Sequence, residues 1–482
     1  MGLLGILLSL CGLIWFAYRG WSVLLLAPAA AIIAAIFAGE PALAHWTVTF
    51  MGGAARFIAQ FFPIFLLGAL FGKLMDDSGS VTAIAHFMAE KFGPRRAILS
   101  VVLAGTLVTY GGVSLFVAFF VLAPMAQELF LKAGTPRRLA PAAIALGTST
   151  FTMSALPGTP AIQNAIPMPF FGTTAFAAPG LGVIASLIML VFGMWWLLRA
   201  EGVARSRGEG FGDEPAAQTD VTQDQAIRER AAAAREFDLA EIPHGKRAGQ
   251  PNVLVAALPL MVVIGVNLLM SLYVLPRLDD SFLSEERWGP TTLAAVSGVW
   301  SVIVALASAI AILILLNWRR LTVIRDSVDA GVTASVLPLV SVASLVGFGA
   351  VVAAMPAFGA VRNWVLGIEG GPLVSLAIAT NVLASLTGSA SGGLTIALDT
   401  LGETYLRLAE QQGINPALLH RVAVIGAGTL DSLPHNGAVV TLLAVCNCKH
   451  SESYFDIVVV AIVGALISLV AVIALGSSFG SF

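Results

Sequence analysis

Long apolar stretches dominate the pattern of hydrophobic and polar positions along this 482-residue chain. About ten of them approach the roughly 20 residues that an α-helix needs to cross the hydrocarbon core of a bilayer. These predicted spans are residues 2–18, 21–38, 57–75, 139–157, 180–198, 252–273, 291–316, 333–356, 421–445 and 455–477. The pattern therefore predicts an all-α polytopic membrane protein.

Two further apolar segments, residues 97–131 and 371–406, are too long for one span, and small residues interrupt both. The interruptions lie at residues 109–114 and 385–393. Non-helical backbone is tolerated at membrane depth only inside protein or beside a water-filled cavity. Each segment is therefore predicted to be a re-entrant hairpin, with two short helices that meet at a non-helical tip.

The two halves of the chain share one order of elements: three spans, one hairpin and two more spans. The odd number of crossings inverts the second half, which predicts an inverted-topology repeat. We expect these repeats at residues 1–198 and 251–482. In both repeats, the helix after the hairpin opens at a proline (Pro136, Pro416) and is interrupted near a second one (Pro157, Pro434).

The segment that joins the halves, residues 199–250, holds 8 basic and 10 acidic residues and is predicted to be a solvated linker. Most Lys and Arg residues near span ends fall on the same side as this linker, which is typical of the cytoplasmic side. Both termini are then expected outside, in a cytoplasmic (inner) membrane. The outer side is left with Arg56, Arg277, Arg287, Arg362, Arg407 and Arg421.

Composition agrees with a membrane location and excludes several partners. Hydrophobic residues make up 57% of the chain and charged residues 11%, whereas a soluble domain has about 25% charged residues. A net charge of −2 gives no reason to expect nucleic-acid binding. The Cys446 to His450 segment lacks the paired spacing of metal motifs, so neither a metal nor another cofactor is expected.

The four breaks, two hairpin tips and two interrupted helices, have the chemistry of an anion site. Half-helix N-termini carry a partial positive charge of roughly +0.5 and oriented N–H groups, which suit a carboxylate. The sequence places no lysine or arginine in this predicted core. The alternative is that small residues merely allow close helix packing. The predicted substrate-binding residues are Thr109, Gly111, Gly112, Ser114, Ser154, Gly158, Thr159, Asn164, Thr387, Ser389, Ser391, Gly392, Ser432 and Asn436.

Asp431 and His435 are the ionisable residues predicted inside the breaks. An ionisable residue at membrane depth is a functional hypothesis by default, and histidine exchanges protons near neutral pH. Both are therefore predicted to couple protons to transport. The alternative is that Asp431 caps the following half-helix and that His435 is a neutral hydrogen-bond donor.

Four strings carry a family resemblance: residues 109–116 (TYGGVSLF), 155–160 (ALPGTP, followed by Gln163 and Asn164), 387–393 (TGSASGG) and 431–437 (DSLPHNG). At these strings the chain resembles the GntP (gluconate permease) family of the ion transporter superfamily, in its hydroxybutyrate-permease-like branch. The resemblance implies a proton-coupled symporter of a small organic anion, a homodimer in the lipid bilayer and elevator-like motion of the hairpin-bearing domain.

Gluconate-type members carry a Phe-Phe-Glu string in the first hairpin, where this chain has residues 113–116 (VSLF). The resemblance therefore favours 3-hydroxybutyrate or a similar short hydroxy or keto monocarboxylate, with gluconate, another sugar acid or a citrate-like carboxylate as alternatives. An anion channel and an intramembrane aspartyl protease are rival classes. The protease would need Asp399 and Asp431 as its catalytic pair, but no Gly-x-Gly-Asp string precedes either residue. We expect no enzyme activity.

Overall fold

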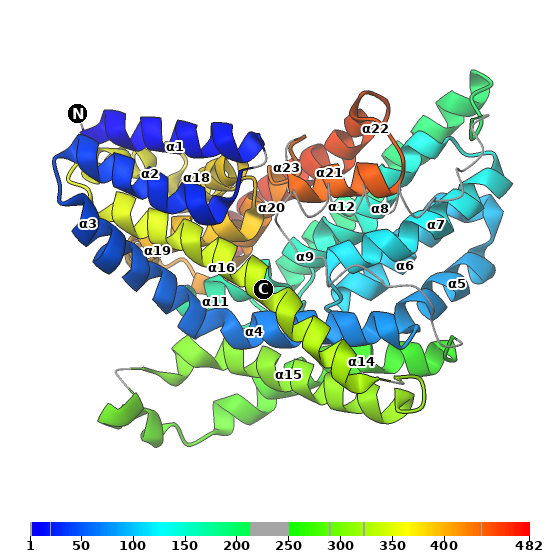
Figure 1. Cartoon of the computed structure of the whole chain (residues 1–482), viewed down its shortest axis with the longest axis horizontal. Helices are drawn as coiled ribbons and strands as arrows, with labels where there is room; N and C mark the ends of the chain where they lie inside the picture. The colour runs from blue at the N-terminus through cyan, green and yellow to red at the C-terminus, as the bar shows by residue number, and fades with distance from the viewer. Residues whose placement is uncertain (1, 20, 213–249, 289–290, 322, 435) are drawn as a thin grey trace.

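The computed structural model of the chain is all-helical (Figure 1). It describes residues 2–19, 21–212, 250–288, 291–321, 323–434 and 436–482, and this described part contains no β-strand. Seven of its helical segments are long and apolar enough to cross a membrane. These segments are Ala42–Asp77, Leu115–Ala133, Pro179–Ser206, Val253–Arg277, Leu293–Asn317, Ile324–Ala354 and His450–Phe479. The chain is therefore a multi-pass membrane protein.

The first half of the chain supplies two shorter apolar helices, a membrane-length segment, one helical hairpin, a series of short helices and a final long helix. In order, its elements are α1 (Gly2–Tyr18), α2 (Val23–Ala38), α3 (Ala42–Ala44), η1 (His45–Phe50), α4 (Met51–Asp77), α5 (Ser80–Phe92), η2 (Pro94–Arg96), α6 (Ala97–Tyr110), α7 (Leu115–Ala133), η3 (Arg137–Leu139), α8 (Ala140–Thr148), α9 (Phe151–Ser154), α10 (Ile162–Ala165), α11 (Pro167–Phe171) and α12 (Pro179–Ser206).

The second half has a similar order of long helices, a helical hairpin and an interrupted helix. Its elements are α14 (Val253–Leu269), η5 (Met270–Val274), η6 (Leu275–Arg277), η7 (Ser281–Ser284), η8 (Glu286–Trp288), α15 (Leu293–Asn317), α16 (Ile324–Ala354), α17 (Phe358–Leu366), α18 (Gly371–Thr387), α19 (Ala390–Gln412), α20 (Pro416–Thr429), α21 (Gly437–Val445), α22 (His450–Ile457), η9 (Val458–Val463) and α23 (Gly464–Phe479).

Some boundaries differ from the hydropathy pattern. The predicted spans 139–157 and 421–445 are divided into short helices, because the backbone leaves the helix near Thr150 and again between α20 and α21. The helices α5 and α17 were not predicted, since their polar residues lower the hydropathy of a sliding window.

The helix α12 continues beyond the expected span end at residue 198. Glu201 stabilises the extension, because its carboxylate accepts hydrogen bonds from Arg205 one turn later and from Thr135. Most of the predicted linker, residues 213–249, lies outside the described residues.

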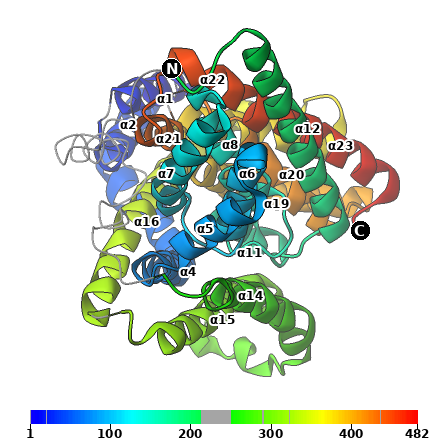
Figure 2. The same ribbon diagram turned by 90° about the vertical axis from the view of Figure 1, so that its right-hand side faces the viewer.

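The helices α4 and α16 pack along each other through the middle of the molecule (Figure 1). Glycines let their backbones approach, since a Cβ atom on Gly53 would lie 2.8 Å from the Cβ of Ala350, and one on Gly331 would lie 2.9 Å from the Cα of Leu70. The α1–α2 pair packs on α16, whereas the α14–α15 pair packs on α4 and α5. In both views α14 and α15 form one side of the molecule (Figures 1 and 2).

Two helical hairpins, α6–α7 and α18–α19, pack against the interrupted helices α8–α9 and α20–α21 (Figure 2). The hairpin arms approach very closely at Gly393, where a Cβ atom would lie 2.2 Å from the backbone nitrogen of Ala384. A Cβ on Gly147 of α8 would lie 2.4 Å from the carbonyl oxygen of Val102 on α6. Small residues thus place both hairpin tips and both interruptions in one region of the fold.

Candidate functional site

A cavity of about 490 Å³ lies where the hairpin tips and the interrupted helices meet. Its wall also includes one face of α4, one face of α16 and the start of α2. Eight of the predicted site residues line it. These residues are Thr109, Gly112, Ser114, Thr387, Ser389, Ser391, Asp431 and Asn436.

The tip of the first hairpin is fixed against the first interruption. Gly112 has φ +98°, a conformation that favours glycine, and a Cβ atom at this position would lie 2.8 Å from the ring of Pro160. The hydroxyl of Tyr110 donates a hydrogen bond of 2.7 Å to the carbonyl of Pro157. Ser114 then begins α7 at the cavity wall.

The tip of the second hairpin is built in a similar way. Gly388 has φ +65° and ends α18, and Ser389 caps α19 by accepting a hydrogen bond from the backbone N–H of Gly392. The hydroxyls of Ser389 and Ser391 lie 3.2 Å apart at the cavity wall.

Asn436 connects this second tip to the second interruption. Its side-chain amide donates a hydrogen bond of 2.8 Å to the carbonyl of Gly388, while its oxygen accepts one from the backbone N–H of Ala438 and so caps α21. Asp431, in the same interruption, accepts a hydrogen bond from the hydroxyl of Ser432. The α21 cap therefore belongs to Asn436, and the structure does not place Asp431 in the capping role.

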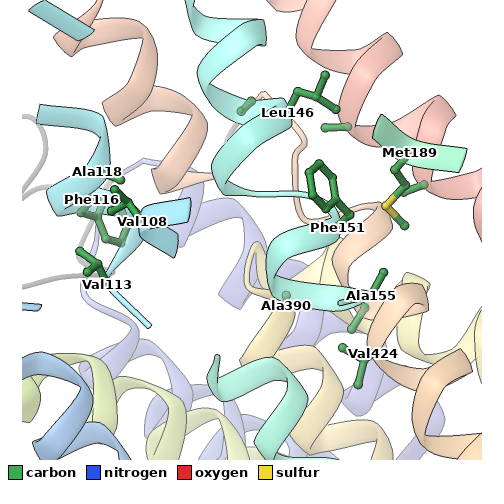
Figure 3. Packing of buried hydrophobic residues seen from close by; sticks show 14 of the residues in the cluster. Val108, Val113, Phe116, Ala118, Leu146, Phe151, Ala155, Met189, Ala390 and Val424 are labelled. Atoms are coloured by element: carbon green, nitrogen blue, oxygen red, sulfur yellow. The ribbon is translucent and has the colours of Figure 1, made fainter. Parts of the chain in front are cut away.

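Buried hydrophobic side chains hold this polar region in place (Figure 3). Val113 and Phe116 pack beside the first tip, and Phe151 and Ala155 pack beside the first interruption. Val424 of α20 belongs to the same buried cluster. The polar groups of the site therefore lie on a close-packed support, which restricts their movement.

Three helices begin at the cavity: α7 after Ser114, α19 after Ser389 and α21 after Asn436. Their first turns place the positive ends of three helix dipoles at the cavity, although Ser389 and Asn436 already accept hydrogen bonds from N–H groups of α19 and α21. The described lining contains no lysine or arginine, and Asp431 is its one charged residue. This arrangement can hold an anion by backbone N–H groups and hydroxyls, without an opposing basic side chain.

The other predicted site residues lie outside the cavity wall. The hydroxyl of Ser154 donates to the carbonyl of Thr150 within its own helix. Gly158 is covered by a neighbouring side chain, because a Cβ atom at this position would lie 2.5 Å from the ring of Phe176. The predicted residues that do not line the cavity are Gly111, Ser154, Gly158, Thr159, Asn164, Gly392 and Ser432. His435 lies outside the described residues.

Arg421 is fully buried, which corrects the prediction that the core contains no arginine. Its guanidinium donates to the carbonyl of Ala177 through Nε at 3.2 Å and Nη2 at 2.6 Å, and to the carbonyl of Ser154 at 3.2 Å. The hydropathy pattern began this span at residue 421, whereas α20 begins at Pro416, so Arg421 lies in the second turn of the helix and is enclosed by its neighbours.

Asn164 and His420 complete this buried network. The amide of Asn164 donates to the carbonyls of Thr159 and Ala175, and its oxygen lies 3.1 Å from Nε2 of His420. Because an amide oxygen only accepts, Nε2 of His420 donates to it and Nδ1 accepts from the hydroxyl of Thr173. Asn164 therefore connects the first interruption to α20 and does not face the substrate cavity.

Gln163 also lines the cavity, although the sequence analysis did not place it among the binding residues. Its neighbour Asn164 was selected instead, and nothing in the sequence distinguishes which of the two amides points inward. No group of three or more His, Cys, Asp or Glu residues that could hold a metal ion occurs in the part of the chain that the structure describes.

The chain is similar to known transporters in both sequence and fold. It is 38% identical to the uncharacterized transporter YxjC of Bacillus subtilis over 485 residues, which cover 98% of this chain and 99% of that protein. It is also 34% identical to the high-affinity gluconate transporter of Escherichia coli, over 24% of this chain and 26% of that protein.

Two solved structures share the fold. The YdaH transporter of Alcanivorax borkumensis has a TM-score of 0.56 at 15% identity, over 91% of this chain and 89% of that one. MtrF of Neisseria gonorrhoeae, described as one of a class of antimetabolite efflux pumps, has a TM-score of 0.53 at 13% identity, over 90% of this chain and 84% of that one. The sequence model of the GntP family permeases matches residues 2–203. Together with the full-length similarity to YxjC, this match shows that the chain belongs to the GntP permease family.

Proposed function

We propose that this GntP-family transporter is a secondary active symporter that carries a short hydroxy or keto monocarboxylate, of the 3-hydroxybutyrate type, together with protons. The convergence of three helix N-termini on a cavity whose described lining contains no lysine or arginine is the observation that carries this proposal. A carboxylate suits such a site because the positive ends of the helix dipoles attract an anion and hydroxyl groups can donate to it. A volume of about 490 Å³ lies within the usual range of small-molecule sites.

Asp431 gives the proposal its coupling mechanism. A substrate carboxylate and the Asp431 carboxylate in one cavity repel each other, and a proton on Asp431 removes that repulsion. Substrate binding and proton binding then favour each other, which is the thermodynamic requirement of symport. The sequence makes His435 a second candidate for the proton carrier.

An elevator-type motion fits the contacts between the breaks. The first tip is bonded to the first interruption through Tyr110 and Pro157, and the second tip to the second interruption through Asn436 and Gly388. The proposed transport domain consists of α6–α9 and α18–α21, which would move as one body against a scaffold that includes α4 and α16. In this proposal the two halves are an inverted-topology repeat, and the protein works as a homodimer in the cytoplasmic membrane.

Gluconate is the second candidate substrate, because one of the relatives is a gluconate transporter. That similarity spans 24% of this chain, so it supports gluconate less strongly than it supports transport. Gluconate has more hydroxyl groups than a short monocarboxylate and would need more polar partners in the cavity. Competition between gluconate and 3-hydroxybutyrate for uptake distinguishes the two candidate substrates.

The purified protein in proteoliposomes should take up 3-hydroxybutyrate in a saturable manner when the outside is more acidic than the inside. Uptake should be measured with a panel of C3 to C6 hydroxy and keto acids, gluconate and citrate, with protein-free liposomes as the control. Collapse of the pH gradient by a protonophore should abolish accumulation. Uptake of gluconate alone would replace the proposed substrate, and flux that neither saturates nor responds to the gradient would indicate a channel.

The proposed topology predicts that the end of α12 faces the cytoplasm. Gly210 is a suitable position for a cysteine, because it is exposed and its Cβ would meet no atom within 4 Å. In a background without Cys11, Cys446 and Cys448, a Gly210→Cys protein should react with an impermeant maleimide in inverted vesicles but not in intact cells. A cysteine at Ala360, an exposed residue of α17, is the opposite-side control. Labelling of Gly210→Cys from outside would contradict this topology.

A further inference from the structure

Gln163 lies at the cavity wall on a segment that is fixed on both sides. Before it, Pro160 packs against the position of Gly112 at the first hairpin tip. After it, Asn164 is fully buried and is bonded to the carbonyls of Thr159 and Ala175. The backbone of Gln163 is thus fixed beside the cavity, whereas its neighbour Asn164 does not line it.

The side-chain oxygen of Gln163 is buried and has no hydrogen-bond partner among the described residues. A buried acceptor without a donor is costly, and such groups in native proteins need an explanation. Other polar side chains of the cavity use their groups on the protein: Ser389 caps α19 and Asn436 bonds Gly388 and caps α21. Gln163 instead lines the cavity with an oxygen that has no hydrogen bond to a described residue.

We infer that Gln163 recognises the hydroxyl group of the substrate, while the three helix N-termini bind its carboxylate. This inference rests on the proposed function and deepens it. Rotation about the last side-chain bond exchanges the oxygen and nitrogen ends of the amide at the cavity. A hydroxyl can donate to the oxygen or accept from the nitrogen, so it pairs with either end.

This recognition ranks the possible substrates. A keto group only accepts, so it pairs with the amide nitrogen and leaves the oxygen of Gln163 without a donor. An unsubstituted fatty acid pairs with neither end. The expected order of affinity is therefore hydroxy acid, then keto acid, then unsubstituted acid, with about tenfold between the first and the last if one neutral hydrogen bond is at stake.

The test compares three acids of equal carbon number in proteoliposomes: 3-hydroxybutyrate, acetoacetate and butyrate. Wild-type protein should show a half-saturation concentration about tenfold lower for 3-hydroxybutyrate than for butyrate. Gln163→Met keeps a similar side-chain length without hydrogen-bonding groups. It should raise the half-saturation concentration for 3-hydroxybutyrate by about that factor and leave the value for butyrate nearly unchanged. The maximal rate should change little, because the effect is on binding.

Ser335→Ala is the matched control, since Ser335 also lines the cavity but its hydroxyl donates to the carbonyl of Val332 in its own helix. This variant should change the half-saturation concentrations for the three acids by one common factor. Equal affinity of the wild type for 3-hydroxybutyrate and butyrate would overturn the inference without any variant. So would a preference that persists in Gln163→Met or that is lost equally in Ser335→Ala. Failure of wild-type protein to transport all three acids would instead overturn the proposed function, and the inference with it.

Discussion

Replacement of Arg421 with leucine should strongly reduce the amount of folded protein and lower its melting temperature in detergent by about 3–6 °C. The guanidinium is fully buried and bonds the carbonyls of Ala177 and Ser154, which would be left without a donor. Each unpaired buried carbonyl costs about 1–3 kcal/mol, so a loss of about 3–6 kcal/mol is expected with the cavity that leucine leaves. Thermal unfolding of purified protein, followed by size-exclusion chromatography, measures the change.

The control is Arg407→Leu, because Arg407 is an exposed arginine on the neighbouring helix α19. Its loss should change the melting temperature by less than about 2 °C. Arg421→Lys tests whether the shape of the guanidinium matters. Lysine keeps the charge but has no planar fork to reach both carbonyls, so the melting temperature of this variant should lie between those of wild type and Arg421→Leu. If Arg421→Leu is as stable as Arg407→Leu, the guanidinium does not hold the first interruption on α20.

Replacement of Asp431 with asparagine should abolish accumulation of substrate driven by a proton gradient and preserve exchange of substrate across the membrane. Asparagine has nearly the same shape and can still pair with Ser432, but it cannot bind and release a proton. Because the proton offsets repulsion between Asp431 and the substrate anion, wild-type exchange should weaken as pH rises and Asp431 loses its proton. Exchange by the variant should not show this pH dependence. Both are measured in proteoliposomes with labelled substrate.

Asp399→Asn is the matched control, since Asp399 is a partly buried carboxylate on α19 that does not line the cavity. The Asp399→Asn protein should still accumulate substrate when a proton gradient is applied. If Asp431→Asn still concentrates substrate against its gradient, Asp431 is not the proton carrier, and His435→Gln becomes the next variant. Full coupling in both variants would mean that the proton travels on the substrate or that another ion drives transport.

The sequence by itself determined the class of protein and the places where its helices break. Apolar runs near membrane length predict multi-pass topology because each span must satisfy its own backbone hydrogen bonds in the bilayer. The small-residue clusters mark the tips at Gly112 and Gly388, where positive φ angles favour glycine. The caps of α20 and α21 at Asn415 and Asn436 are local features too, since a helix cap depends on residues only two or three positions away, although Asn436 was predicted as a binding residue and not as a cap.

Only the tertiary structure decided which polar side chains face the cavity. The interrupted segments have no helical period, so a side chain's direction there cannot be inferred from spacing. Asn164 points away from the cavity because its partner is His420, 256 residues later in the chain, whereas its neighbour Gln163 lines the cavity wall. Arg421 is buried for the same reason, because its acceptors at Ser154 and Ala177 come from the other half of the chain. Local sequence specifies where a helix stops, but contacts between residues far apart in the chain determine where the freed groups point.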